Sequence, residues 1–442
     1  MRLRICNLSF TICAAASLAL TDSLAAQSTN PPQPIDLASA LRLAGAQNLD
    51  VQIARERLRE AQANHQSAVA QFFPWISPGI TYRRHDDNIQ DVSGNIVGVN
   101  KYSYAPGATV AAQVDLGDAI YKSLASKQLA GAAGHALEAQ RQDTVLAAAQ
   151  GYFDLALAQG ALAAARESVK ISEDYETQIR NAVAAGIAFK GDALRAVVQL
   201  ERNQLTLRQA EEQRRVGAAR LAQTLRLNPV VELVAQDAEL APLTLIETNT
   251  ALDSVVARTL ASRPELKQSQ SLVTAAKDAR NGATYGLLIP TVGAQAFFGG
   301  LGGGRSGVDD TFGPQEDYLV GASWRIGPGG LFDFSRVHAG DARLKAAQLG
   351  ADKVRDEITR QAVEAFARWQ SLADQLQTAK RALAAAEEGF RLAQQRKEFA
   401  VGVVLETLQA EQDLTRTRLD YLRAIAEFNK AQYALSKATG KL

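Results

Sequence analysis

Hydrophobic positions recur at helical spacing over long stretches of the chain, and short segments of β-type residues interrupt them. One seam steps by three and four residues and is filled mainly by small side chains, which suits closely packed helices. A second series repeats every seven residues and predicts left-handed supercoiling against a neighbouring helix. The first seam is Leu146, Ala149, Phe153, Ala156, Gly160 and Ala163; the second is Leu414, Tyr421, Phe428 and Leu435.

These patterns predict a mainly α-helical protein with a minor β part. A helix of about 60 residues is about 90 Å long, several times the reach of a small domain. The glycine-rich stretch 299–307 is predicted to be a flexible outer loop, because it lacks the Gly-Lys-Ser/Thr of a phosphate loop. Helices are expected over residues 36–72, 120–185, 192–227, 251–285, 334–398 and 406–438, and strands over 80–82, 104–116, 291–298 and 318–326.

The chain carries an internal duplication. Ala185-Gly186-Ile187, with Asp192 after it, returns about 215 residues later as Val401-Gly402-Val403, with Glu406 after it. This distance is too long for a solenoid repeat and indicates a duplicated domain. The expected organisation is a signal peptide over 1–26, a first repeat over 35–228, a connector over 229–250 and a second repeat over 251–440.

The N-terminus has the pattern of a secretory signal. Arg2 and Arg4 precede an apolar run, and Ser23-Leu24-Ala25 offers small residues for cleavage. Cleavage there would remove both cysteines, so no disulfide is expected. Lipidation of Cys13 is the alternative, and the bulky Ile12 before it argues against that.

Charge and composition give no support to several classes of function. A net charge of +1 gives no field that attracts nucleic acid. The four histidines form no recognisable metal-ligand pattern, and no nucleophile–base grouping stands out. The sequence therefore favours neither an enzyme nor a cofactor-binding protein. Four β-type segments are also too few to close a barrel within one chain, so other subunits must complete the sheet.

At this point the chain, over about 35–440, resembles the TolC-like outer-membrane efflux family. The resemblance rests on the duplication, on the order of helices and strands in each copy, and on two local stretches. One is Trp324-Arg325-Ile326-Gly327 with the Gly-Gly-Leu-Phe-Asp turn at 329–333. The other is the glycine tip at 401–403 followed by Glu406-Thr407-Leu408-Gln409-Ala410.

The resemblance implies a homotrimer whose strands form one twelve-stranded β-barrel in outer-membrane lipid and whose helices form a tunnel through the periplasm. Such a duct exports small molecules that an inner-membrane pump of RND, ABC or MFS type delivers through a periplasmic adaptor. Two alternatives stay open. The duct can instead serve type I protein secretion, or the chain can be a periplasmic coiled-coil structural protein without a pore.

The resemblance also implies sites. Glu406, Asp192 and Gln409 are expected at the periplasmic pore entrance, where threefold symmetry would form rings of carboxylates. The alternative for the two acids is a favourable place at a helix N-terminus, where negative charge meets the helix dipole. The tips are expected to dock the adaptor, unless their glycines only turn the hairpins. The tip residues are Ala185, Gly186, Ile187, Val401, Gly402 and Val403.

Overall fold

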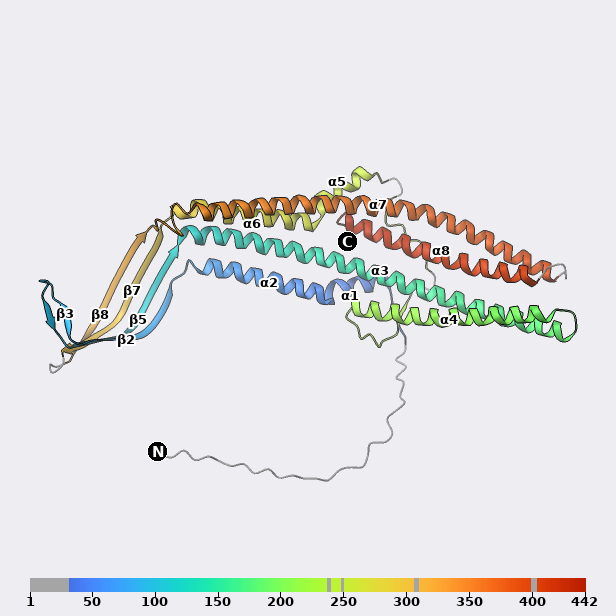
Figure 1. The fold of residues 1–442 in the computed structure, drawn as a ribbon, viewed down its shortest axis with the longest axis horizontal. Coiled ribbons are helices and arrows are strands. Elements are labelled where there is room, and N and C mark those ends of the chain that lie inside the picture. The colour runs from blue at the N-terminus through green and yellow to red at the C-terminus, as the bar shows by residue number, and fades with distance from the viewer. Residues whose placement is uncertain (1–31, 237–239, 248–249, 306–309, 399–403) are drawn as a thin grey trace, which may run out of the picture.

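The computed structural model describes residues 32–236, 240–247, 250–305, 310–398 and 404–442. The molecule is elongated, with a β-sheet at one end and the ends of two helical hairpins at the other (Figure 1). The predicted signal peptide lies outside the described residues. The elements are β1 (Gln33–Ile35), α1 (Leu37–Gln47), α2 (Leu49–Ala70), β2 (Trp75–His85), β3 (Asn88–Gln90), β4 (Ile96–Gly98), β5 (Lys101–Asp115), α3 (Leu116–Ala184), α4 (Lys190–Thr224), β6 (Leu233–Ala235), α5 (Leu252–Ser262), α6 (Pro264–Tyr285), the 3₁₀ turn η1 (Gly286–Leu288), β7 (Thr291–Arg305), β8 (Thr311–Ser323), α7 (Phe334–Glu398) and α8 (Val404–Ala438).

The helices come in two sets of closely matched length. Helices α1 and α5 have 11 residues each, α2 and α6 have 22, and α4 and α8 have 35. The long helices α3 and α7 have 69 and 65 residues, so each extends for about 100 Å. The exact bounds of the two predicted repeats stay a prediction.

Two helices that were expected to be continuous are each broken in two. The predicted helix over 36–72 is interrupted at Asn48, and the one over 251–285 is interrupted at Arg263. The first break has a side-chain cap, because the Asn48 Oδ1 accepts the backbone N–H of Asp50 at 2.8 Å. At the second, Pro264 begins α6, and a residue before proline is held away from the helical conformation.

All four long strands belong to one antiparallel sheet in the order β2–β5–β7–β8. The two halves of the chain meet at the β5–β7 pair, which runs from Lys101↔Arg305 to Asp115↔Thr291. Strand β2 begins at Trp75 rather than at the predicted residue 80, because its pairing with β5 starts at Trp75↔Ala111 and continues through Pro78↔Ala108. Strands β2 and β8 leave unpaired edges within the chain.

The predicted outer loop at 299–304 is wrong, because these residues belong to β7. Glycine is needed there: a Cβ on Gly302 would overlap the Tyr104 ring, and one on Gly300 would overlap the Phe312 ring. The two rings come from β5 and β8 and lie nearly parallel, with centroids 6.0 Å apart. The aromatic side chains of the neighbouring strands thus cover the bare backbone of β7. Residues 306–309 lie outside the described part.

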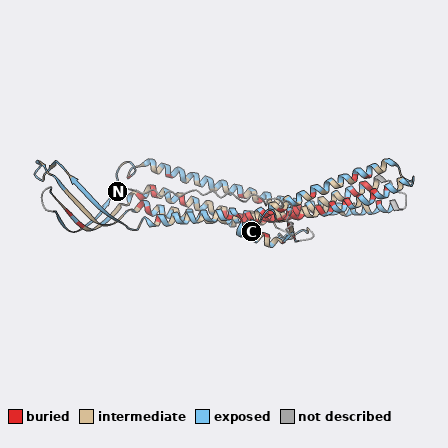
Figure 2. Ribbon diagram, turned by 90° about the horizontal axis from the view of Figure 1, so that it is seen from below, coloured by how far each residue is buried: buried red, intermediate tan, exposed pale blue. Residues whose placement is uncertain are grey.

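Burial concentrates where α3 passes α1 and α4, near the middle of the molecule (Figure 2). The predicted α3 seam is correct at Ala149, Phe153 and Ala156, which are buried. It is wrong at Ala163, which is exposed, while Leu162 and Ala165 turn inward against Ala210. A strict seven-residue seam drifts around an α-helix, because 3.6 residues per turn do not divide seven. None of the helices in the described ranges combines the length and apolar run needed to cross a bilayer.

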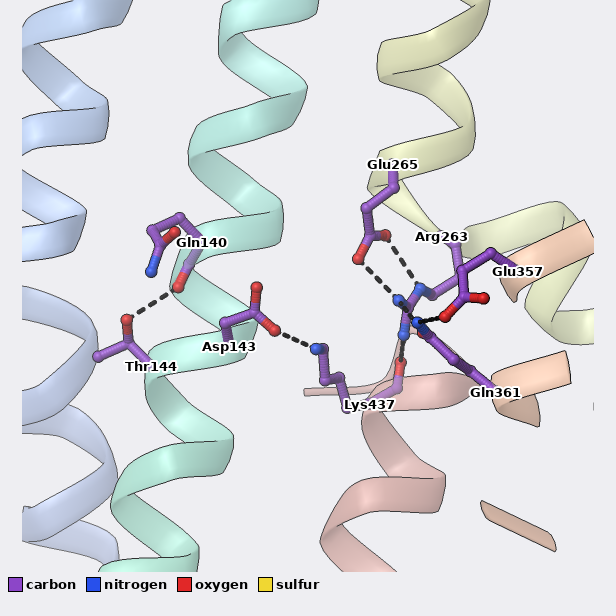
Figure 3. A network of polar contacts seen from close by, with 8 residues as sticks. All are labelled: Gln140, Asp143, Thr144, Arg263, Glu265, Glu357, Gln361 and Lys437. Carbon is purple, nitrogen blue, oxygen red and sulfur yellow. Dashed lines mark hydrogen bonds and ion pairs between the residues drawn. The ribbon is translucent and has the colours of Figure 1, made fainter. Parts of the chain in front are cut away.

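A buried arginine joins three helices at the same level (Figure 3). The Arg263 guanidinium, 4% exposed, forms two hydrogen bonds with Glu265, at 2.7 and 2.9 Å. It also donates to the backbone oxygen of Lys437 at 3.3 Å and to the Gln361 side chain at 3.3 Å. Lys437 itself pairs with Asp143 of α3. The guanidinium therefore ties the α5–α6 break to α7 and to the C-terminal end of α8.

The connector between the two halves, predicted to be irregular, is held by two side-chain amides of α8. Asn429 accepts the N–H of Leu243 at 2.8 Å and donates to the oxygen of Ala241 at 2.9 Å. Gln432 donates to the oxygen of Leu243 at 2.8 Å and accepts the N–H of Leu245 at 2.7 Å. Both amides are almost fully buried. They satisfy backbone groups that would otherwise lack partners away from water.

Candidate channel entrance and docking tips

The first hairpin tip is a compact helix stop. Gly186 follows α3 with φ +73° and lies in the left-handed region that favours glycine. Its N–H donates to the oxygen of Val183 at 3.0 Å, and the N–H of Ile187 donates to that of Ala182 at 2.9 Å. This pair of bonds satisfies carbonyl groups at the end of α3. The turn exposes Ile187 and Phe189, so the hairpin ends in an apolar surface.

The second hairpin tip, Val401-Gly402-Val403, lies outside the described residues. Helix α7 ends at Glu398 and α8 begins at Val404, so the predicted helix break falls on this segment.

The two predicted entrance acids each lie in the first turn of a returning helix and contact an arginine of the same hairpin. Glu406 is the third residue of α8 and accepts a hydrogen bond from Arg396 at 2.6 Å, with its side chain 39% exposed. Asp192 is the third residue of α4 and lies 3.2 Å from Arg195, with its side chain 25% exposed. Both the position at a helix N-terminus and the nearby arginine favour the negative charge of each carboxylate. Gln409 is exposed on α8.

The two hairpins pack together just behind these acids. Leu408, two residues after Glu406, shares an apolar cluster with Ala196, four residues after Asp192. Tyr175 and Ile179 of α3 complete that cluster. Burial, together with the nearby Asp192 charge, raises the pKa of Tyr175 to about 12, so its hydroxyl stays neutral at physiological pH. The fold therefore brings both returning helices to one level at the end of the bundle.

A buried carboxylate in the contact between the hairpins escaped the sequence-based predictions. Glu411 of α8 is 3% exposed, and its Oε1 accepts hydrogen bonds from Ser168 at 2.5 Å and Asn203 at 3.3 Å. Burial raises the pKa of the Glu411 carboxyl, and these two hydrogen bonds oppose the shift. A signal was present in the sequence, since Glu411 lies midway between the inward-facing Leu408 and Leu414 at helical spacing.

Other polar contacts join α8 to the first hairpin along the length of the two elements. Gln412 donates to Gln199 at 2.6 Å, and Arg418 pairs with Glu167 at 2.6 Å. Lys430 pairs with Asp154 further along. Within the described ranges no group of three or more histidine, cysteine, aspartate or glutamate side chains is placed to hold a metal ion. The contact between the two hairpins thus combines the apolar cluster around Leu408 with a series of polar pairs along α8.

Comparison with known proteins agrees with this architecture. A family model described as outer membrane efflux protein matches residues 40–225 and 255–441. The protein CyaE of Bordetella pertussis is 26% identical over 314 residues, or 70% of this chain. That match spans 65% of the length of CyaE, slightly less than two thirds.

Solved structures show the same fold. A membrane protein from Pseudomonas aeruginosa matches with a TM-score of 0.79 at 19% identity, covering 91% of this chain and 93% of that one. The CmeC outer membrane channel of Campylobacter jejuni matches with a TM-score of 0.74 at 16% identity, covering 92% of this chain and 85% of that one. Because the family model matches both halves over most of their length, the chain belongs to the outer membrane efflux protein family.

Proposed function

We propose that the protein is the outer-membrane channel of a tripartite efflux system and exports small molecules from an inner-membrane pump. Its family places it in the cell outer membrane, with the helices extending into the periplasm. The observation that carries the proposal is the family match of both halves on a chain whose sheet continues into helices about 100 Å long. The role is transport rather than catalysis.

The functional unit is a homotrimer. The described sheet has four long strands, and unpaired strand edges are unstable in lipid. Three copies joined edge to edge, β8 to β2, give twelve strands, which is enough for a closed barrel. Native mass spectrometry in detergent should therefore find three chains, and a mass of one or two chains would contradict the closed barrel.

The hairpin tips dock a periplasmic adaptor, which connects the duct to a pump of RND, ABC or MFS type. The apolar tip at Ala185-Gly186-Ile187 supports this role, because small and apolar residues let partner helices approach closely. Val401-Gly402-Val403 would supply the second docking point. Glu406, Asp192 and Gln409 would line the pore entrance, since the two acids lie in the first turns of the returning helices next to the tips.

Deletion of the gene tests the exported cargo. A strain without the protein should accumulate a fluorescent cationic dye such as ethidium, and a plasmid copy should restore export. Unchanged dye accumulation together with the loss of an exported protein from the medium would contradict small-molecule efflux and indicate a type I secretion duct.

A further inference from the structure

A cavity of about 460 Å³ lies between α3, α7 and α8, close to the hairpin ends. Its walls include Tyr175 of α3, Phe390 of α7, and Thr407, Leu408 and Glu411 of α8. We call it the hairpin cavity. All of its described lining residues belong to three helices of one chain. Its volume falls within the range of pockets that bury small organic molecules.

The cavity is acidic. Glu411 and Asp174 both line it, and no lysine, arginine or histidine is among its described lining residues. The Glu411 carboxylate is held in place by Ser168 and Asn203, which are neutral hydrogen-bond donors. Neutral donors reduce the cost of burying a charge but do not neutralise it. A cation inside the cavity would therefore be attracted to Glu411, whose own side chain is almost fully buried.

Two aromatic rings share the cavity with this carboxylate. Tyr175 is almost fully buried, and Phe390 is half-buried on the facing helix. Aromatic faces attract cations, and they favour alkylammonium groups, whose charge is spread over apolar surface. The described residues contain no group suited to a bare metal ion, and the cavity is much larger than such an ion needs. Charge, aromatic lining and volume together fit a small organic cation.

We propose that the hairpin cavity binds a small organic ammonium ion, with Glu411 as its counter-ion and Tyr175 and Phe390 as apolar walls. Such a ligand bridges α8 and α7 to α3 and so stabilises the contact between the two hairpins. The site is a property of the single chain and does not depend on which pump or adaptor the channel serves.

Binding of benzyltrimethylammonium to the purified full-length protein in detergent tests the proposal, for example by calorimetry at low salt. Phenylacetate, which has the same ring and the opposite charge, is the ligand control. We expect Glu411→Gln to weaken benzyltrimethylammonium binding at least tenfold. Glu388→Gln is the matched protein control, because it removes the same charge from an exposed acid that is already paired with Arg391 at 2.6 Å. That variant should bind like the wild type.

Three results would overturn the site: no binding to the wild type, equal binding to wild type and Glu411→Gln, or equally tight binding of phenylacetate. If Glu411→Gln does not assemble, Phe390→Leu takes its place, because Phe390 is only half-buried and leucine keeps the position apolar. Loss of affinity in Phe390→Leu would support the site, and unchanged affinity would overturn it. Because no pump or adaptor is present, failure here is distinct from failure of the proposed export function.

Discussion

The side-chain amide of Asn48 donates a hydrogen bond to the backbone oxygen of Thr224 at 2.9 Å, across 176 residues of sequence. It thereby holds the end of α4 against the break between α1 and α2. In the second half, Arg263 at the α5–α6 break donates to the backbone oxygen of Lys437 near the end of α8. Different side chains thus make the same connection in the two halves, because both meet carbonyl groups that a helix end leaves unsatisfied.

Replacement of Asn48 should destabilise the middle of the molecule. Asn48→Ala removes both the cap on Asp50 and the bond to Thr224, and we expect a loss of about 2 kcal/mol in the free energy of unfolding. Asn48→Ser retains a capping oxygen but is too short to reach Thr224, so it should lose about half as much. Denaturant unfolding in detergent measures both, and equal stability of all three proteins would show that the bond contributes nothing.

Glycine at the end of α4 should stabilise the protein. Arg226 is exposed and has φ +56°, a left-handed conformation that costs a non-glycine residue about 1 kcal/mol. Gly440 has φ +66° after α8, so the second half already has glycine at its corresponding helix end. We therefore expect Arg226→Gly to raise the free energy of unfolding by about 1 kcal/mol. Arg226→Ala, which keeps the strain, is the control and should change stability little.

The buried Glu411 should make stability fall as pH rises. Burial raises the folded-state pKa of Glu411 above its ordinary value of 4.5, so the folded protein holds this proton more tightly than the unfolded chain. The stabilising contribution is complete below 4.5 and is lost as pH rises through the folded-state pKa. Glutamine at position 411 does not titrate, so the Glu411→Gln variant does not lose stability in this way. The difference in melting temperature, variant minus wild type, should therefore increase between pH 4 and pH 7. A constant difference across this range would contradict the shift.

Substitutions of Gly186 should separate the turn from adaptor docking. Gly186→Asn tolerates the left-handed conformation, and the space around a Cβ at this position is open, so folding and docking should both persist. Gly186→Glu places a charge on the apolar tip, and we expect it to retain the trimer and membrane insertion while losing adaptor crosslinking and efflux. Gly402→Glu should behave alike. If the glutamate variants still crosslink to the adaptor, the two glycines serve only to turn the hairpins and take no part in docking.

Ion selectivity should depend on the pairing of Glu406 with Arg396. In planar bilayers at low salt, the channel should prefer potassium over chloride, because acidic rings attract cations. Glu406→Gln should reduce that preference more than Asp192→Asn does. Arg396→Gln should increase it, because it removes the cation that pairs with Glu406. Selectivity that does not change in any of the three variants would assign both acids a role in helix capping alone.

The sequence by itself determined the long helices, because their signals are local, although it missed the breaks at Asn48 and Arg263. The 3.6-residue periodicity, the glycines and the prolines fixed α7 to its observed ends and α3 to within four residues of them. The same local signals located Gly186 as a hairpin turn and placed the two acids within two residues of the starts of α4 and α8. A helix satisfies its backbone within its own segment, so nothing distant is needed to recognise it.

Tertiary structure alone decided the features whose partners lie far apart in the chain. The glycine run of β7 forms a strand because Tyr104 and Phe312 of its neighbours cover it, and glycine carries no side chain that predicts such a partner. Residues 241–245 of the connector are held in place because Asn429 and Gln432 bind their backbone nearly 190 residues away. Glu411 could be recognised as an inward-facing acid, but only the folded α3 and α4 supply Ser168 and Asn203 to hold it. Strand pairing and buried polar contacts draw on groups that only the assembled fold brings within hydrogen-bond distance, and local sequence does not encode which groups those are.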